Sequence, residues 1–96
     1  MIEHTANMNR KPTSADTAVL YENLTKHSYF STAKLYETGI GMMDDPANSN
    51  WEILSIGLTD NGFFIAECLH PRDAQSVLYA IITDLFREDG IIVEEC

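Results

Sequence analysis

The chain has 96 residues, a hydrophobic content of 45% and a formal net charge of −9. This length and composition predict one small globular domain and exclude a disordered chain. Six lysines and arginines stand against fifteen aspartates and glutamates, which excludes direct binding to nucleic acid, because phosphates must be neutralised by a basic patch.

The first twelve residues, which end at Pro12, are polar and show no hydrophobic periodicity. We therefore expect a flexible lead at 1–12 and a single folded domain at 13–96. The N-terminus does not show a basic segment followed by an apolar core, so a signal peptide is not expected. The apolar runs are all too short to span a membrane. With only two cysteines, the chain is predicted to be cytoplasmic and reduced.

A first helix is predicted near 14–26. Thr13 and Ser14 provide hydroxyl caps, and Asp16 places an acid in the first helical turn, where it complements the helix dipole. Leu20 and Leu24 then fall on one face of that helix.

The next segment, 29–43, has two open assignments. A cap at Ser31 favours a helix, which is our preferred assignment. The alternative is a strand through Leu35–Ile40, since Gly39 and Gly41 each weaken a helix by about 1 kcal/mol relative to alanine.

A loop is predicted over 44–50, which is rich in Asp, Asn and Pro, and a β-hairpin after it. Its strands are 51–58 and 63–69, and the intervening Asn61-Gly62 tolerates the positive φ values that tight turns demand. Apolar residues occur at both alternating sets of positions, so we expect both faces of the hairpin to be at least partly covered.

Residues 71–88 form the clearest predicted helix, with Pro71 at its first position and Gly90 as its left-handed stop. A short closing strand follows at 91–94. The fold class predicted is α+β with two layers: a small antiparallel sheet, made of the hairpin and the C-terminal strand, packed against amphipathic helices. The expected core contacts join one helical stripe to the sheet; they involve Val77, Leu78, Ile81, Leu85 and Phe86 against Leu54, Ile56 and Phe63 or Phe64.

Catalytic and metal-binding motifs are missing from the sequence. Cys68, His70 and Asp73 form the one cluster of possible ligands, but zinc requires a fourth ligand at a suitable spacing. A structural Cys68 facing the core and a His70 capping a helix are the favoured interpretations. We therefore expect neither an enzyme nor a metal or cofactor.

The acidic residues carry the functional hypothesis. Seven of them fall in the predicted loop, hairpin turn and last helix–strand corner, and could form one negative rim that docks on a basic groove of another protein. The alternative is that these acids only keep the protein soluble. The candidate partner-binding residues are Asp44, Asp45, Asp60, Glu88, Asp89, Glu94 and Glu95.

Residues 51–66, with Trp51 leading into the Asn61-Gly62 turn and then Phe63-Phe64, resemble the tryptophan-to-"NGGFFMAP" segment of the KlcA/ArdB antirestriction family. One glycine replaces the usual pair, Glu67-Cys68 replaces the proline, and the chain is shorter than that family. The resemblance implies a mobile-element protein that blunts host defence through protein contacts, without catalytic residues.

The sequence therefore leaves two alternative hypotheses for the function. The first is a non-enzymatic inhibitor of an antirestriction or anti-CRISPR kind, whose partner is a basic protein surface such as that of a nucleic-acid-handling defence complex. The second is a structural or regulatory homodimer that associates through apolar surface. The salt dependence of association distinguishes these two hypotheses, because salt screens charged contacts and leaves apolar association intact.

Overall fold

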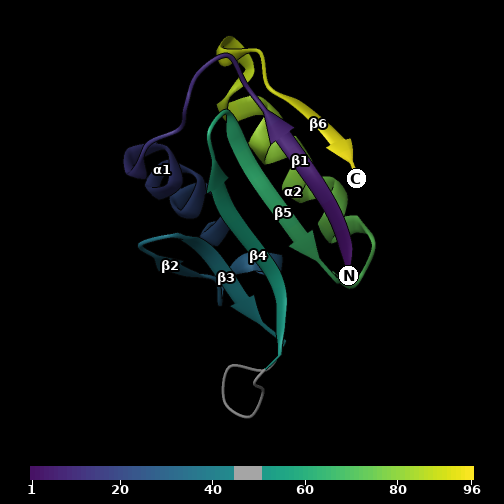
Figure 1. Ribbon diagram of the computed structural model, residues 1–96. Helices are drawn as coiled ribbons and strands as arrows, with labels where there is room; N and C mark the ends of the chain where they lie inside the picture. The colour runs from purple at the N-terminus through teal and green to yellow at the C-terminus, as the bar shows by residue number, and fades with distance from the viewer. Residues whose placement is uncertain (45–50) are drawn as a thin grey trace.

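The computed structural model describes residues 1–44 and 51–96 of the chain. These residues form strands, two α-helices and two short 3-10 helices (Figure 1). In chain order the elements are β1 (Ile2–Asn7), α1 (Ser14–Thr25), η1 (Ser28–Phe30), β2 (Lys34–Tyr36), β3 (Gly39–Met43), β4 (Glu52–Thr59), β5 (Gly62–Glu67), α2 (Asp73–Leu85), η2 (Arg87–Asp89) and β6 (Ile92–Glu95).

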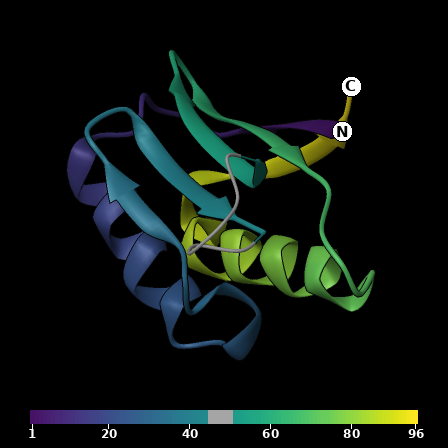
Figure 2. The same ribbon diagram turned by 90° about the horizontal axis from the view of Figure 1, so that it is seen from below.

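All six strands belong to one antiparallel sheet in the order β2-β3-β4-β5-β1-β6. Both α-helices lie on the same face of that sheet (Figure 2). The two-layer α+β fold predicted from the sequence is confirmed. The sheet is larger than the predicted hairpin plus C-terminal strand, because β1, β2 and β3 also join it.

The prediction of a flexible lead at 1–12 is wrong for its first half. Residues 2–7 form β1, which pairs with β5 on one side and β6 on the other. His4 and Ala6 face the helices and are buried, whereas Glu3 and Thr5 face away. Ile2 is the one large apolar residue of β1, so pairing with two distant strands, not local propensity, determines this strand.

The segment 29–43 also differs from its preferred assignment. Instead of a helix, it contains η1 and the β2–β3 hairpin, so the strand alternative was nearer the structure. Gly39 has a φ of 153°, and a Cβ at that position would collide with the Ile56 carbonyl oxygen of β4. Gly39, one of the two glycines that argued against a helix, therefore allows β3 to approach β4 closely.

The β4–β5 hairpin is confirmed, but the predicted reason for its glycine is wrong. In the described part of the chain only Gly39 and Gly90 have positive φ, so the Asp60-Asn61 turn does not use that conformation. A Cβ at Gly62 would instead collide with the carbonyl oxygen of Ala6 in β1. Gly62 is required by its neighbouring strand, not by its turn.

Both predicted helices are present. α1 matches the prediction near 14–26, and α2 covers most of 71–88, followed by η2 and the left-handed Gly90 with φ 70°. Pro71 precedes α2 by two residues and is not at its first position. β6 confirms the closing strand. Across the described residues, no helix combines the length and the apolarity needed to cross a membrane.

The core lies between the helices and the sheet. Leu78 and Ile82 of α2 are fully buried, and the ring of Phe86 packs on Phe63 with 5.3 Å between ring centroids. Phe63, rather than Phe64, therefore faces the helices. Val77, Ile81 and Leu85, which the stripe also included, are only partly buried at its edges.

Candidate functional site

The predicted acidic rim does not form one continuous group. Asp60 in the β4–β5 turn and Glu88 and Asp89 in η2 lie at the same end of the sheet. The segment after β1 connects these two places by backbone hydrogen bonds. The Met8 N–H donates to the Asn61 carbonyl at 2.7 Å, and the Asn9 N–H donates to the Asp89 carbonyl at 2.8 Å. We call Asp60, Glu88 and Asp89 the acidic end.

The remaining predicted acids lie elsewhere. Asp44 follows β3 and is next to the start of β4, at the opposite end of the sheet from Asp60. Eight residues of β4 separate these ends, roughly 25 Å at about 3.3 Å per residue. Glu94 and Glu95 occupy the edge strand β6 and point to opposite faces. Asp45 lies outside the described residues.

Asp89 forms an ion pair with an arginine that it shares with Asp16. The Arg10 guanidinium donates to the Asp89 carboxylate at 3.0 Å and to the Asp16 carboxylate at 2.7 Å. The hydrogen bond from Arg10, supported by the Thr13 backbone N–H, lowers the pKa of Asp16 from 3.8 to about 2. This bridge joins the start of α1 to η2, so Asp89 is a structural residue and not a free acidic contact.

This bridge predicts a pH-dependent stability. The contribution of ionised Asp16 is complete above its ordinary pKa of 3.8 and is lost as the pH falls through about 2. Asp16→Asn should therefore lower the midpoint of thermal unfolding by about 4 °C near neutral pH. The difference from wild type should vanish near pH 2, as circular dichroism melts at several pH values can show. A difference that persists undiminished at that pH would contradict the role of the ion pair.

Cys68, His70 and Asp73 are not brought together as a metal-binding group in the described part of the chain. All three side chains are exposed, so the expectation that Cys68 faces the core is wrong. His70 does not cap α2 either, because Arg72 holds the N-cap position and makes no side-chain cap bond. Among residues 1–44 and 51–96, no group of three or more His, Cys, Asp and Glu is placed to hold a metal ion.

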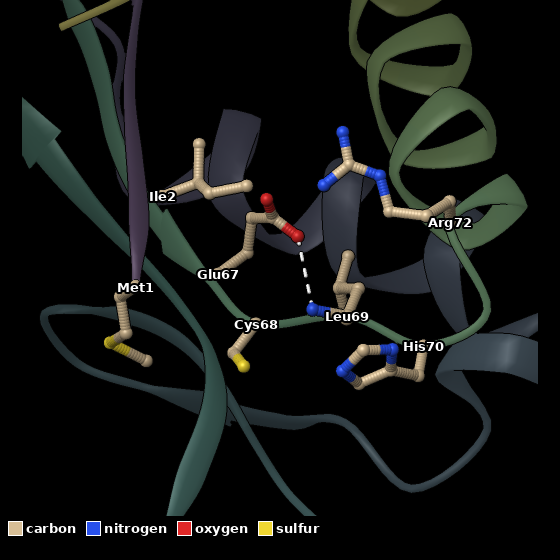
Figure 3. A pocket seen from close by; sticks show the side chains of 7 residues that line it. All are labelled: Met1, Ile2, Glu67, Cys68, Leu69, His70 and Arg72. Carbon is tan, nitrogen blue, oxygen red and sulfur yellow. Dashed lines mark hydrogen bonds between the residues drawn. The ribbon is translucent and has the colours of Figure 1, made fainter.

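A cavity of about 300 Å³ lies between the start of β1 and the segment that leads into α2. In Figure 3, Met1 and Ile2 lie on one side of it, and His70 and Arg72 on the other. Glu67 between them is only 2% exposed; its carboxylate accepts hydrogen bonds from the Leu69 N–H at 3.1 Å and from the Gln75 amide at 2.8 Å. These neutral donors satisfy the buried carboxylate, which is thereby held in place as part of the fold.

A second polar group, Tyr79 with His4, lies near Glu67 and was not predicted from the sequence. The Tyr79 hydroxyl is 2.6 Å from Nδ1 of His4, and Nε2 of His4 is 3.9 Å from Glu95. Burial, with further contributions from Glu67 and Glu95, raises the pKa of Tyr79. Tyr79 thus keeps its proton, and the hydrogen bond between its hydroxyl and His4 Nδ1 ties β1 to α2.

Charge is unevenly distributed between the two layers. Five of the six cations lie in the helices or the segments that flank them: Arg10, Lys11, Lys26, Arg72 and Arg87. The sixth, Lys34, is the only cation on a strand. The sheet therefore carries acids with little compensating positive charge.

The sheet face away from α1 and α2 has no helix over it in the described part of the chain (Figure 2). The expectation that both faces are covered is thus wrong for this side. We call it the open face; it carries Glu3, Thr5, Lys34, Tyr36, Glu52, Ser55, Gly57, Phe64, Ala66 and Glu94.

Comparison with known proteins gives no relative: no family model, no curated protein and no solved structure matches this chain.

Proposed function

We propose that this chain is a small acidic, non-enzymatic interaction protein that inhibits another protein by docking on its basic surface. The observation that carries the proposal is the charge difference between the layers. Glu3, Glu52 and Glu94 lie on the open face with Lys34 as the one cation there. A surface of one sign attracts the opposite sign and speeds association.

The biological setting of the proposal follows from the resemblance of residues 51–66 to the KlcA/ArdB segment. That resemblance favours an anti-defence protein of a phage or plasmid, acting in the cytoplasm on a restriction or CRISPR complex. Complexes of this kind present basic grooves for nucleic acid, to which an acidic surface is complementary.

A homodimer that associates through apolar surface is the second candidate. It is favoured by the large apolar side chains left exposed on the sheet, with Ile92 at 61% and Phe64 at 37%. Two open faces placed together would, however, bring Glu3, Glu52 and Glu94 of both copies into proximity, and like charges across an interface cost several kcal/mol. Light scattering at low and high salt tests it: a dimer that persists at high salt would favour this candidate.

The charge-based proposal predicts a selective loss of binding. The partner is first recovered from the host of origin and purified. Glu3→Lys combined with Glu94→Lys should then weaken its association at least tenfold, because attraction becomes repulsion on the open face. The matched control, Glu22→Lys with Glu37→Lys, has the same net charge but changes exposed acids away from the open face.

Surface plasmon resonance at about 50 mM and about 500 mM salt measures both variants and wild type. We expect salt to slow association steeply for wild type. Equal binding by the two variants, together with an association rate that ignores salt, would mean that the acids only solubilise the chain.

A further inference from the structure

The open face has unfilled space over Gly57 of β4. A Cβ built at Gly57 in β4 would have no heavy atom within 4 Å. β4 is one of the two central strands, so this open space lies in the middle of the face. A partner side chain could therefore reach the backbone of the sheet at Gly57 without displacing any atom.

An aromatic ring stands on one side of this position. Phe64 of β5 is directly opposite Gly57 in the register, and its side chain remains 37% exposed. In an antiparallel pair, directly opposite residues lie about 4.5–5.5 Å apart. The partly exposed Phe64 ring is thus within reach of a group that rests on Gly57.

A carboxylate and a second aromatic ring stand on the other side. Both the Glu52 carboxylate and the Tyr36 ring lie over Gly41, as a Cβ at Gly41 would meet both of them. Gly41 pairs with Ser55, two residues before Gly57, and such diagonal neighbours lie roughly 7–8 Å apart. No ion pair to Glu52 occurs among the described residues.

These groups match the chemistry of arginine. Its aliphatic stem can lie on the bare backbone at Gly57, its planar guanidinium can stack on an aromatic face, and its forked donors fit a carboxylate. Lysine fits less well, because its compact and strongly hydrated ammonium neither stacks nor donates in a fork.

We propose that the open face binds the basic partner by receiving an arginine side chain over Gly57, stacked on Phe64 and paired with Glu52. This inference rests on the proposed function and locates its contact. A second copy of the chain cannot supply the arginine from its own open face, which carries only Lys34. The acidic end offers charge but no exposed aromatic ring.

The first experiment uses N-acetyl-arginine amide as the probe, followed by two-dimensional NMR. We expect saturable shifts of the Gly57 amide and the Phe64 ring, and none with N-acetyl-citrulline amide, the neutral analogue. Gly57→Val fills the open position and should abolish these shifts, while the empty surroundings of that Cβ leave the fold intact. Phe64→Leu tests the ring without adding bulk and should weaken binding severalfold.

Charge is tested with a matched pair of variants. Glu52→Gln should weaken binding of the arginine probe severalfold, whereas Glu22→Gln, which removes one exposed carboxylate from α1, should leave it unchanged. Equal losses in both variants, or shifts spread over all acidic residues, would overturn the site and indicate unspecific attraction.

A second probe, an octa-arginine peptide, separates this inference from the proposed function. Binding by wild type that is lost in Gly57→Val supports both. Salt-dependent binding that is the same in wild type and Gly57→Val overturns the arginine position and keeps the acidic docking surface. If the peptide does not bind even at low salt, both fail.

Discussion

Replacing Ile82 with alanine is expected to lower the free energy of unfolding by about 2–5 kcal/mol, whereas the same change at Ile81 should cost less than half as much. Ile82 is fully buried between α2 and the sheet, next in the stripe to the equally buried Leu78. Ile81 sits at the edge of the same stripe and is only partly buried. The cavity left by truncation is therefore closed at Ile82 and open to solvent at Ile81.

Urea unfolding of both variants provides the measurement. The two changes are chemically identical and adjacent in one helix, so differences in helix propensity cancel. Unchanged slopes with denaturant would show that only stability has changed. Equal losses at the two positions would contradict the packing of α2 on the sheet described above.

The elements that the sequence predicted well are those with local determinants. α2 repeats apolar residues at helical spacing and ends at Gly90, and the β4–β5 hairpin joins two β-rich runs through a two-residue turn. These patterns need no knowledge of distant partners. The helical stripe still could not distinguish Ile81 from Ile82, because periodicity defines a face but not which residue lies at its centre.

The elements that were missed depend on distant partners. β1 pairs Ile2 with Glu67 and is held on its other side by β6, so its stability derives from residues more than fifty positions away. β2 has only three residues, too few for a pattern of alternation. Such strands form because of the sheet that they join, and tertiary context overrides their weak propensity.

The candidate site shows the same division. The abundance of acids was evident from composition, but their separation into an acidic end, an edge strand and Asp44 depends on the topology. Arg10 reaches Asp89 across 79 positions, and no local rule predicts that this acid is held in an ion pair. Gly57 and Phe64 become a candidate contact only once the helices are known to cover the other face.

Gly62→Ala should reduce stability by about 3 kcal/mol or more, because its new methyl group would collide with the Ala6 carbonyl oxygen and force β1 away from β5. Gly57→Ala is the matched control: it lies in the paired strand of the same hairpin, and its methyl group meets no atom. That variant should be as stable as wild type or more stable by about 0.5–1 kcal/mol, since alanine restricts the unfolded chain.

Chemical unfolding compares the two glycine variants, and amide hydrogen exchange locates the damage. In Gly62→Ala, protection should be lost first in β1 and in β6, which is attached to the sheet through β1. If Gly62 served only the hairpin turn, its loss would instead loosen Asp60 and Asn61 and leave β1 protected. Retained protection of β1, with a stability close to that of Gly57→Ala, would show that the N-terminal strand does not need the close approach at Gly62. If protection is lost only in β1 and β6, the N-terminal residues of β1 are an integral part of the sheet.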